Sequence, residues 1–256
     1  MAILNTKIAA VSYLNTVPFV YGIQHADSLR AELLLAPPAE CARNYLSKKA
    51  DIALVPVGSL PLFDDAEIVT NYCIGAEKSV RTVTVMSNSP ISEIENLWLD
   101  SHSMTSALLV KILAAELWNI KPQWKELSDY SIVQSSAEKD AFLLIGDKVF
   151  PYEGKFRYTY DLADCWRELT GKPFVFAVWI ARKGTDPELI DALEAALETG
   201  VERIWEAIVE YGHDDKDYAY PYLTENIDFL FDYQKRQALA LYWDKGQKFA
   251  PRANPG

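Results

Sequence analysis

Groups of hydroxyl and amide side chains follow several of the apolar runs in this chain. The first group is Ser12-Tyr13-Leu14-Asn15, which comes directly after an apolar run that ends at Val11. Side chains of Ser, Thr and Asn at such a place often cap the start of a helix. The free N–H groups of a helix start also attract negative charge. The turn after Val11 therefore has two interpretations, a plain helix cap or a site for a small anionic ligand.

Further groups of the same kind stand at the ends of other apolar runs. They are Pro56 to Ser59 after a strand-like run, Ser103 to Ser106 before an apolar helix, and Gly146-Asp147 after another strand-like run. Each group alone is typical of a helix cap or a tight turn. Their recurrence along the chain favours one shared binding site.

The inventory of side chains for acid–base or metal chemistry is small. The sequence has three histidines, of which His25 and His213 lie in polar surroundings typical of solvated side chains, and His102 lies in a Ser-rich stretch. It contains no HExxH helix, no GxSxG elbow, no glycine-rich phosphate loop and no dinucleotide fingerprint. Zinc hydrolysis, nucleotide hydrolysis and dinucleotide chemistry therefore have no support, and we expect no metal site.

Charge and cysteine usage limit the partners and the compartment. The chain has 256 residues and a formal net charge of −11, which argues against nucleic acid or an anionic membrane as the main partner. Cys41, Cys73 and Cys165 are scattered without CxxC spacing, which suits a reducing compartment. There is neither a secretory signal pattern nor an apolar run of membrane-spanning length. We therefore expect a cytoplasmic protein without membrane insertion.

The elements that must position the polar groups form an α/β pattern, because strand-like runs alternate with helical ones. In the first part of the chain we expect strands at 7–11, 31–36 and 51–55 and helices at 17–23 and 37–45. After residue 186 the pattern becomes helical. Its spacing predicts one helix from Asp186 and another over residues 227–242.

Two segments rich in β-branched residues, 80–86 and 173–181, bracket a block with its own helix at 107–118 and strand at 141–145. This pattern predicts one lobe interrupted by a second, with two crossover strands between them and a cleft that suits a small molecule. The predicted lobes are residues 1–84 with 178–256, and residues 85–177.

Aromatic residues are frequent towards the C-terminus, and an aromatic ligand cage is one interpretation. We favour the other, that they pack helices against the core or lie at the surface. These residues are Trp205, Tyr211, Tyr218, Tyr220 and Tyr222.

Five stretches together resemble the chorismate dehydratases of the futalosine route to menaquinone. They are AVSYLNTVPFVYGI (10–23), ADIALVPVGSLP (50–61), SMTSALLVKIL (103–113), DAFLLIGDKVF (140–150) and YDLADCWRELTGKPFVFAVWIAR (160–182). The resemblance implies the two-lobed fold of type II periplasmic binding proteins, with the ligand in the cleft. It also implies conversion of chorismate to 3-[(1-carboxyvinyl)oxy]benzoate and water, without a metal or organic cofactor.

The resemblance also implies roles for particular residues. Asn15 and Thr82 are the expected catalytic residues, and Thr82 stands where the family usually has Ser. Met104 stands where the family commonly has Arg, which leaves the neighbouring hydroxyls and the helix start as the expected anion site. The expected substrate-binding residues are Ser12, Asn15, Pro56, Ser103, Thr105, Ser106, Gly146 and Asp147.

No protein base stands out in these stretches, because they place no His, Glu or Lys in the expected cleft. One hypothesis is that the enolpyruvyl carboxylate of the substrate takes the proton, and His102 is the alternative base. Three other functions stay open: a non-catalytic solute-binding protein for a small carboxylic acid, the related dihydroxynaphthoate synthase, and a paralogue acting on another cyclic dicarboxylate. The SYLNTVP stretch does not match the start typical of the synthase. Fold alone does not choose among these functions.

Overall fold

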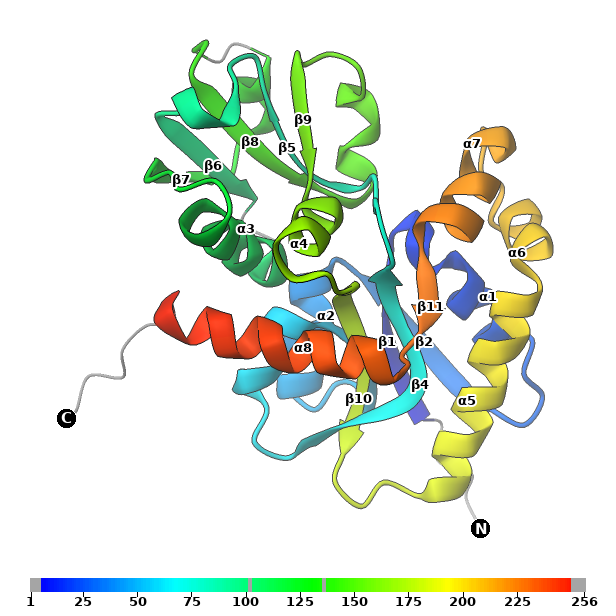
Figure 1. Ribbon diagram of the computed structural model, residues 1–256. Coiled ribbons are helices and arrows are strands. Elements are labelled where there is room, and N and C mark those ends of the chain that lie inside the picture. Colours follow the sequence, from blue (N-terminus) through cyan, green and yellow to red (C-terminus); the bar gives the residue numbers. More distant parts are fainter. Residues whose placement is uncertain (1–5, 101–102, 135–136, 250–256) are drawn as a thin grey trace.

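The computed structural model describes residues 6–100, 103–134 and 137–249, which form two β-sheets with helices around them (Figure 1). The large sheet has six strands in the spatial order β11 (Asp228–Leu230), β4 (Ala66–Ala76), β10 (Phe174–Arg182), β3 (Ile52–Pro56), β1 (Thr6–Val11) and β2 (Ala31–Ala36). The small sheet has five strands in the order β7 (Gln123–Leu127), β6 (Asn96–Asp100), β8 (Asp140–Ile145), β5 (Val83–Ser87) and β9 (Tyr158–Asp161).

Strands of the large sheet contact helices α1 (Val17–Gln24), α2 (Pro38–Leu46), α5 (Pro187–Glu202) and α8 (Tyr233–Gly246). Helix α6 (Ile204–Tyr211) packs against α1, and α7 (Lys216–Pro221) packs against α6. Helices α3 (Met104–Glu116) and α4 (Leu162–Thr170) contact strands of the small sheet. Helix α8 runs alongside β10 and also contacts α3, so it joins the two parts of the molecule (Figure 1).

Single turns of other helix types complete the structure. They are the 3₁₀ turns Leu14–Thr16, Val57–Leu62, Ile91–Glu93, Tyr130–Val133, Gly146–Lys148, Phe150–Tyr152 and Gln247–Phe249, and the π turn Tyr222–Asn226. Several of them follow the carboxyl ends of strands and carry the polar groups of the sequence. Across the described ranges, no helix has both the length and the apolar character needed to span a bilayer.

The strands of both sheets are mixed in direction. In the large sheet β1 runs parallel to β2 and β3, whereas β10 runs antiparallel to both β3 and β4. The chain leaves this sheet after Ala76 and returns at Phe174, and these two residues are partners in adjacent strands. The carboxyl ends of β1 and β3 therefore lie near the point where the chain crosses between the sheets.

The large apolar core includes buried residues from both sheets and the helices between them. Its biggest side chains include Trp166 and Trp179, both fully buried. A second, smaller cluster is made by strands and turns of the small sheet; its buried members are Met86, Leu127, Val133, Phe142, Leu144 and Val149. Burial on this scale is ample for a stable chain of this length.

The structure differs from the expected elements in the C-terminal part and in one additional strand. The predicted helix over 227–242 was wrong in its first part, because Asp228–Leu230 is the edge strand β11, paired with β4. Asp232 then caps α8 by accepting a hydrogen bond from the N–H of Lys235, so the helix cannot begin earlier. The strand β4 was not predicted; Thr70, within it, has a left-handed backbone (φ 68°) that interrupts the strand pattern.

The segment 80–86 is a strand only from Val83 onwards. The expected crossover strand 173–181 corresponds to β10, which lies wholly in the large sheet, including Phe174 to Ala177. The division into two lobes stays a prediction, and the strand pairing favours boundaries within 77–82 and 171–173 over those expected.

Candidate functional site

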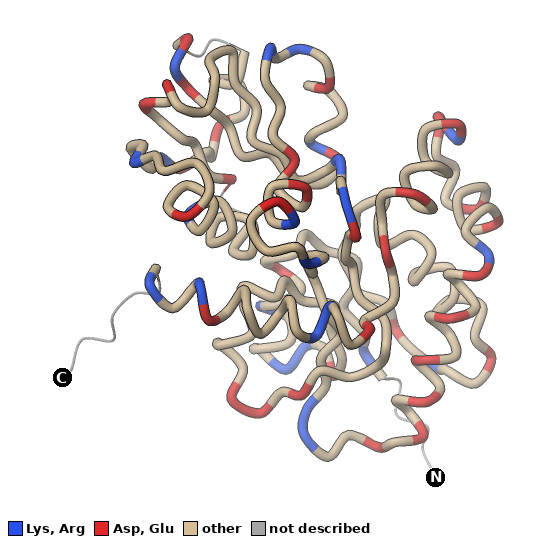
Figure 2. The backbone as a smooth tube through the Cα atoms, in the orientation of Figure 1, with Lys and Arg blue, Asp and Glu red and all other residues tan. Residues whose placement is uncertain are grey.

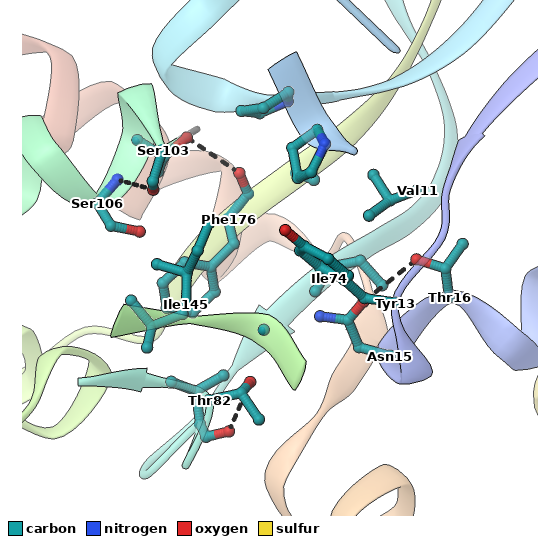
Figure 3. Close-up of a pocket in the computed structure, with 17 residues that line it drawn as sticks. Val11, Tyr13, Asn15, Thr16, Ile74, Thr82, Ser103, Ser106, Ile145 and Phe176 are labelled. Atoms are coloured by element: carbon teal, nitrogen blue, oxygen red, sulfur yellow. Dashed lines mark hydrogen bonds between the residues drawn. The ribbon is translucent and has the colours of Figure 1, made fainter. Parts of the chain in front are cut away.

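A pocket lies between the two sheets, at the carboxyl ends of β1, β3 and β8 (Figure 3). Its empty space is about 580 Å³, part of it open to solvent. The apolar part of the wall is made by Val11, Pro38, Pro56, Ile74, Val80, Val83, Ile145, Phe176 and Ala177. The polar part is made by Tyr13, Asn15, Thr16, Thr82, Ser103, Thr105 and Ser106, with Gly146 beside them.

Asn15 occupies the 3₁₀ turn that follows β1. Its Oδ1 accepts a hydrogen bond from the Thr16 hydroxyl at 3.2 Å. This bond turns the amide nitrogen away from Thr16 and towards the pocket, as Figure 3 shows. An amide nitrogen only donates hydrogen bonds, so Asn15 presents a neutral donor to whatever fills the pocket.

Thr82 is held at the pocket by the turn that crosses between the sheets. Arg81, just before it, has a left-handed backbone (φ 62°). The carboxylate of Asp161 stabilises this turn by accepting from the Arg81 N–H at 2.7 Å and from the Ser79 hydroxyl at 2.8 Å. The Thr82 hydroxyl lies 2.8 Å from the hydroxyl of Tyr222, which is buried.

The first turn of α3 supplies the hydroxyls on the opposite wall. Ser103 caps the helix by accepting from the Ser106 N–H at 3.1 Å. Thr105 accepts from the Gly58 N–H at 3.0 Å and donates to the carbonyl of Phe176 at 3.3 Å. Within the described part of the chain the Ser106 hydroxyl has no hydrogen-bond partner. Ser106 is therefore the member of this group whose side chain is free for a ligand.

Two glycines allow the sheets to come close together beside the pocket. A Cβ at Gly58 would lie 2.6 Å from the backbone nitrogen of Thr105, and a Cβ at Gly146 would lie 2.6 Å from the Tyr13 ring. Gly146 also has a left-handed backbone (φ 59°), which disfavours other residues. At both places, segments from the two sides of the pocket are therefore in close contact.

Asp147 joins the same two segments but does not line the pocket. Its carboxylate accepts a hydrogen bond from the Leu14 N–H, with both oxygens within 3.3 Å. Burial raises the pKa of Asp147, and the Leu14 N–H and the charge of His213 oppose that shift. Asp147 therefore fixes the Asn15 turn from the other sheet.

Tyr13 is a pocket residue that the sequence analysis did not assign. Its hydroxyl points into the pocket (Figure 3). Burial, and then the charges of Asp100 and Asp147, raise the pKa of Tyr13 to about 12. The phenol therefore keeps its proton near neutral pH and is a hydrogen-bond donor. The only available signal was its place in the SYLN turn.

The structure brings together most of the predicted site residues. Those that line the pocket are Asn15, Pro56, Thr82, Ser103, Thr105, Ser106 and Gly146. Ser12 is exposed and lies on a neighbouring groove, and Met104 is exposed on the outer side of α3. His102 lies outside the described residues. His25 and His213 do not line the pocket, and His25 pairs with Glu210 at 2.8 Å at the surface.

The described lining residues carry no formal charge. Acidic residues follow α5 and the helices after it (Figure 2), away from the pocket lining. In the described ranges there is no group of three or more His, Cys, Asp or Glu that would hold a metal ion. Any negative charge on a ligand here must be met by neutral donors and by the first turn of α3.

Comparison with known proteins identifies the family. A sequence profile described as menaquinone biosynthesis matches residues 6–248. The chain belongs to this menaquinone biosynthesis family. A chorismate dehydratase from Thermus thermophilus is 28% identical over 194 residues, which is 68% of this chain and 70% of that protein.

Solved structures confirm the predicted fold of this family member. A protein from Archaeoglobus fulgidus is 18% identical with a TM-score of 0.77, over 97% of this chain and 99% of that one. A protein from Candida albicans, described as having the generic periplasmic binding protein fold, is 12% identical with a TM-score of 0.64, over 96% and 94%. The periplasmic aliphatic sulphonate binding protein of Escherichia coli has a TM-score of 0.63 at 13% identity, over 96% and 86%.

Proposed function

We propose that this protein is a chorismate dehydratase, a hydro-lyase of the cytoplasm that forms 3-[(1-carboxyvinyl)oxy]benzoate and water. The observation that carries the proposal is the pocket itself, in which Asn15, Thr82 and the first turn of α3 surround one space. Membership of the menaquinone biosynthesis family and the similarity to the Thermus thermophilus enzyme support the same function. The cysteines are free and buried, which agrees with a reducing compartment.

The reaction needs orientation and neutral donors more than it needs a strong protein acid or base. Chorismate loses a proton from the ring carbon that carries the enolpyruvyl ether, and it loses hydroxide from the neighbouring carbon. After proton removal the electron pair is delocalised through the diene into the ring carboxylate. Donors aimed at this carboxylate stabilise the developing charge. Loss of the hydroxide then completes the aromatic ring.

The pocket provides donors for both ends of this process. The Ser106 hydroxyl, the Tyr13 phenol and the first turn of α3 are suited to the carboxylates of the substrate. Asn15 and Thr82 are suited to the ring hydroxyl, which departs as water when it receives a proton. Because most of the pocket wall is apolar, hydrogen bonds from these donors to a bound substrate are strengthened.

The described lining residues include no carboxylate, Lys or His that would take the ring proton. We assign this role to the enolpyruvyl carboxylate of the substrate, which then passes the proton to the departing hydroxide. A chorismate analogue with that carboxylate converted to an amide is expected to bind without being dehydrated. Dehydration of this analogue at a near-normal rate would contradict the assignment. His102 is the alternative base, and an unchanged rate in His102→Ala would exclude it.

The first test is to incubate the purified protein with chorismate, without added metal or cofactor. The product is followed by chromatography and mass spectrometry. Formation of the carboxyvinyloxy benzoate supports the proposal. Chorismate binding without turnover would instead favour a solute-binding protein, a possibility that the likeness of fold to the sulphonate binding protein keeps open. If the protein neither binds nor converts chorismate, the result would point to another cyclic dicarboxylate as the substrate.

A further inference from the structure

Tyr222 is a buried residue that touches the proposed catalytic group from behind. It opens the π turn Tyr222–Asn226 after α7, and it is 1% exposed. Its hydroxyl lies 2.8 Å from Thr82 Oγ1, yet Tyr222 is absent from the pocket lining. π turns interrupt helices at some cost and often occur at functional sites. Tyr222 therefore meets the site only through other residues.

The contacts around Tyr222 set the direction of its hydrogen bonds. The Tyr222 hydroxyl is buried, and Thr82 Oγ1 is its hydrogen-bond partner within the described ranges. Burial raises the pKa of Tyr222, so the phenol stays protonated. A buried hydroxyl proton needs an acceptor, and Thr82 Oγ1 lies at hydrogen-bond distance. Tyr222 therefore donates to Thr82 Oγ1.

The Thr82 hydroxyl also has a single proton to donate. When Thr82 Oγ1 accepts from Tyr222, its proton is directed either to the carbonyl of Val80 or into the pocket. The Val80 carbonyl is 3.4 Å away, which is long for a bond between a hydroxyl and a carbonyl. A ligand oxygen in the pocket is the better acceptor.

We propose that Tyr222 is a positioning residue that begins a chain of donors from Tyr222 through Thr82 to the substrate, so that Thr82 donates to the departing hydroxyl. The inference rests on the proposed dehydratase function. In such a chain each donor polarises the next one.

The test begins with Tyr222→Phe, which removes the hydroxyl and keeps the ring contacts with Phe150 and Tyr218. We expect kcat to fall about tenfold to a hundredfold, as for loss of a buried hydrogen bond that acts in the transition state. KM should change less than about twofold, since the carboxylates of the substrate bind elsewhere. An unchanged kcat in the folded variant would overturn the proposal.

Tyr45→Phe is the matched control. Tyr45 is also buried, and its hydroxyl has no hydrogen-bond partner among the described residues. Its removal is expected to leave both kcat and KM at the parent values. A fall in kcat for both variants would show a general effect of altering buried tyrosines and would contradict a specific role for Tyr222.

The decisive measurement combines Tyr222→Phe with changes at position 82. In a Thr82→Val background the added Tyr222→Phe change should reduce kcat less than about twofold, because the group it positions is gone. In a Thr82→Ser background, which keeps the hydroxyl, it should reduce kcat by the full factor. If the added Tyr222→Phe change also reduced kcat by the full factor in the Thr82→Val background, the proposed chain would be overturned. Absence of chorismate turnover in the parent protein would instead overturn the dehydratase function, and with it this inference.

Discussion

The two polar walls of the pocket use similar residue types in different ways. On one wall, Asn15 directs its amide N–H groups into the cleft, and the Thr82 hydroxyl is held from behind by Tyr222. On the other wall, the hydroxyls of Ser103 and Thr105 are engaged in capping α3 and in joining it to the large sheet. The difference shows that a polar side chain at a strand end is free for chemistry only when another group satisfies the local backbone.

Asp147 is the group that leaves the Asn15 wall free. The 3₁₀ turn Leu14–Thr16 has no side-chain cap of its own, and the Leu14 N–H is satisfied by Asp147 from the small sheet. Helix α3 has no such external partner at the Ser106 N–H, so Ser103 must accept from it. The contrast between the walls has a physical basis. The α3 wall is capped by its own side chain, Ser103, whereas the Asn15 wall is capped by a distant carboxylate, that of Asp147.

The largest effect is expected for Asn15→Ala. This change removes a donor from the pocket but no cap and no core side chain, so folding should be normal. Loss of a preorganised donor of this kind reduces kcat by about a hundredfold to a thousandfold. Steady-state kinetics with chorismate measure the loss of kcat, and thermal unfolding checks that the variant folds normally. Turnover at the parent rate would show that the assignment of this wall to catalysis is wrong.

A smaller effect is expected from forcing the walls apart at Gly146. An alanine there would place Cβ 2.6 Å from the Tyr13 ring on a left-handed backbone. We expect kcat/KM to fall at least about tenfold, because closure around the substrate is prevented.

Gly154→Ala is the control for backbone strain. Gly154 has a similar φ of 70°, and a Cβ there would have nothing within 4 Å. This variant should lose about 1 kcal/mol of stability and keep its activity. Equal losses of activity in the two variants would attribute the effect to strain and not to contact between the walls.

The third prediction separates the two serines of the α3 wall. Ser106→Ala is expected to raise KM about tenfold, because its hydroxyl is free for a substrate carboxylate. Ser103→Ala is expected to lower stability by about 1 kcal/mol through loss of the helix cap. Kinetics and chemical denaturation of both variants measure these effects. The opposite pattern, with KM raised only by Ser103→Ala, would reverse the roles assigned here.

Most of the residues that the sequence singled out line one pocket, because they stand at strand ends, where local patterns are strong. The runs before Ser12, Pro56 and Gly146 are short and buried, and the groups after them meet at one pocket. The same reasoning could not tell a cap from a ligand contact. That distinction depends on partners such as Asp147, which is 133 residues from Leu14.

Tyr222 shows the other limit of sequence reasoning. It was interpreted as a packing residue along with its aromatic neighbours, and its ring does pack against Phe150 and Tyr218. Its hydroxyl reaches Thr82 only because a π turn at the far end of the chain lies against the crossover between the sheets. No local pattern at either residue indicates that contact. The edge strand β11 was missed for a related reason, because its three residues pair with a strand far away in the sequence.

The smallest effect, and the finest test of the contrast, is expected for Asp147→Asn. Burial raises the pKa of Asp147 in the folded protein, so its carboxylate destabilises the fold at pH values above that pKa. An asparagine oxygen still accepts from the Leu14 N–H but carries no buried charge. The melting temperature at pH 7 should therefore rise slightly in this variant. As the pH falls through the folded-state pKa the parent protein binds a proton and the difference shrinks, and it should vanish below about pH 4, where the unfolded chain is also protonated. Thermal unfolding at a series of pH values checks this; a lower melting temperature at pH 7 would mean that the charge of Asp147 itself, and not only its acceptor oxygen, holds the Asn15 turn in place.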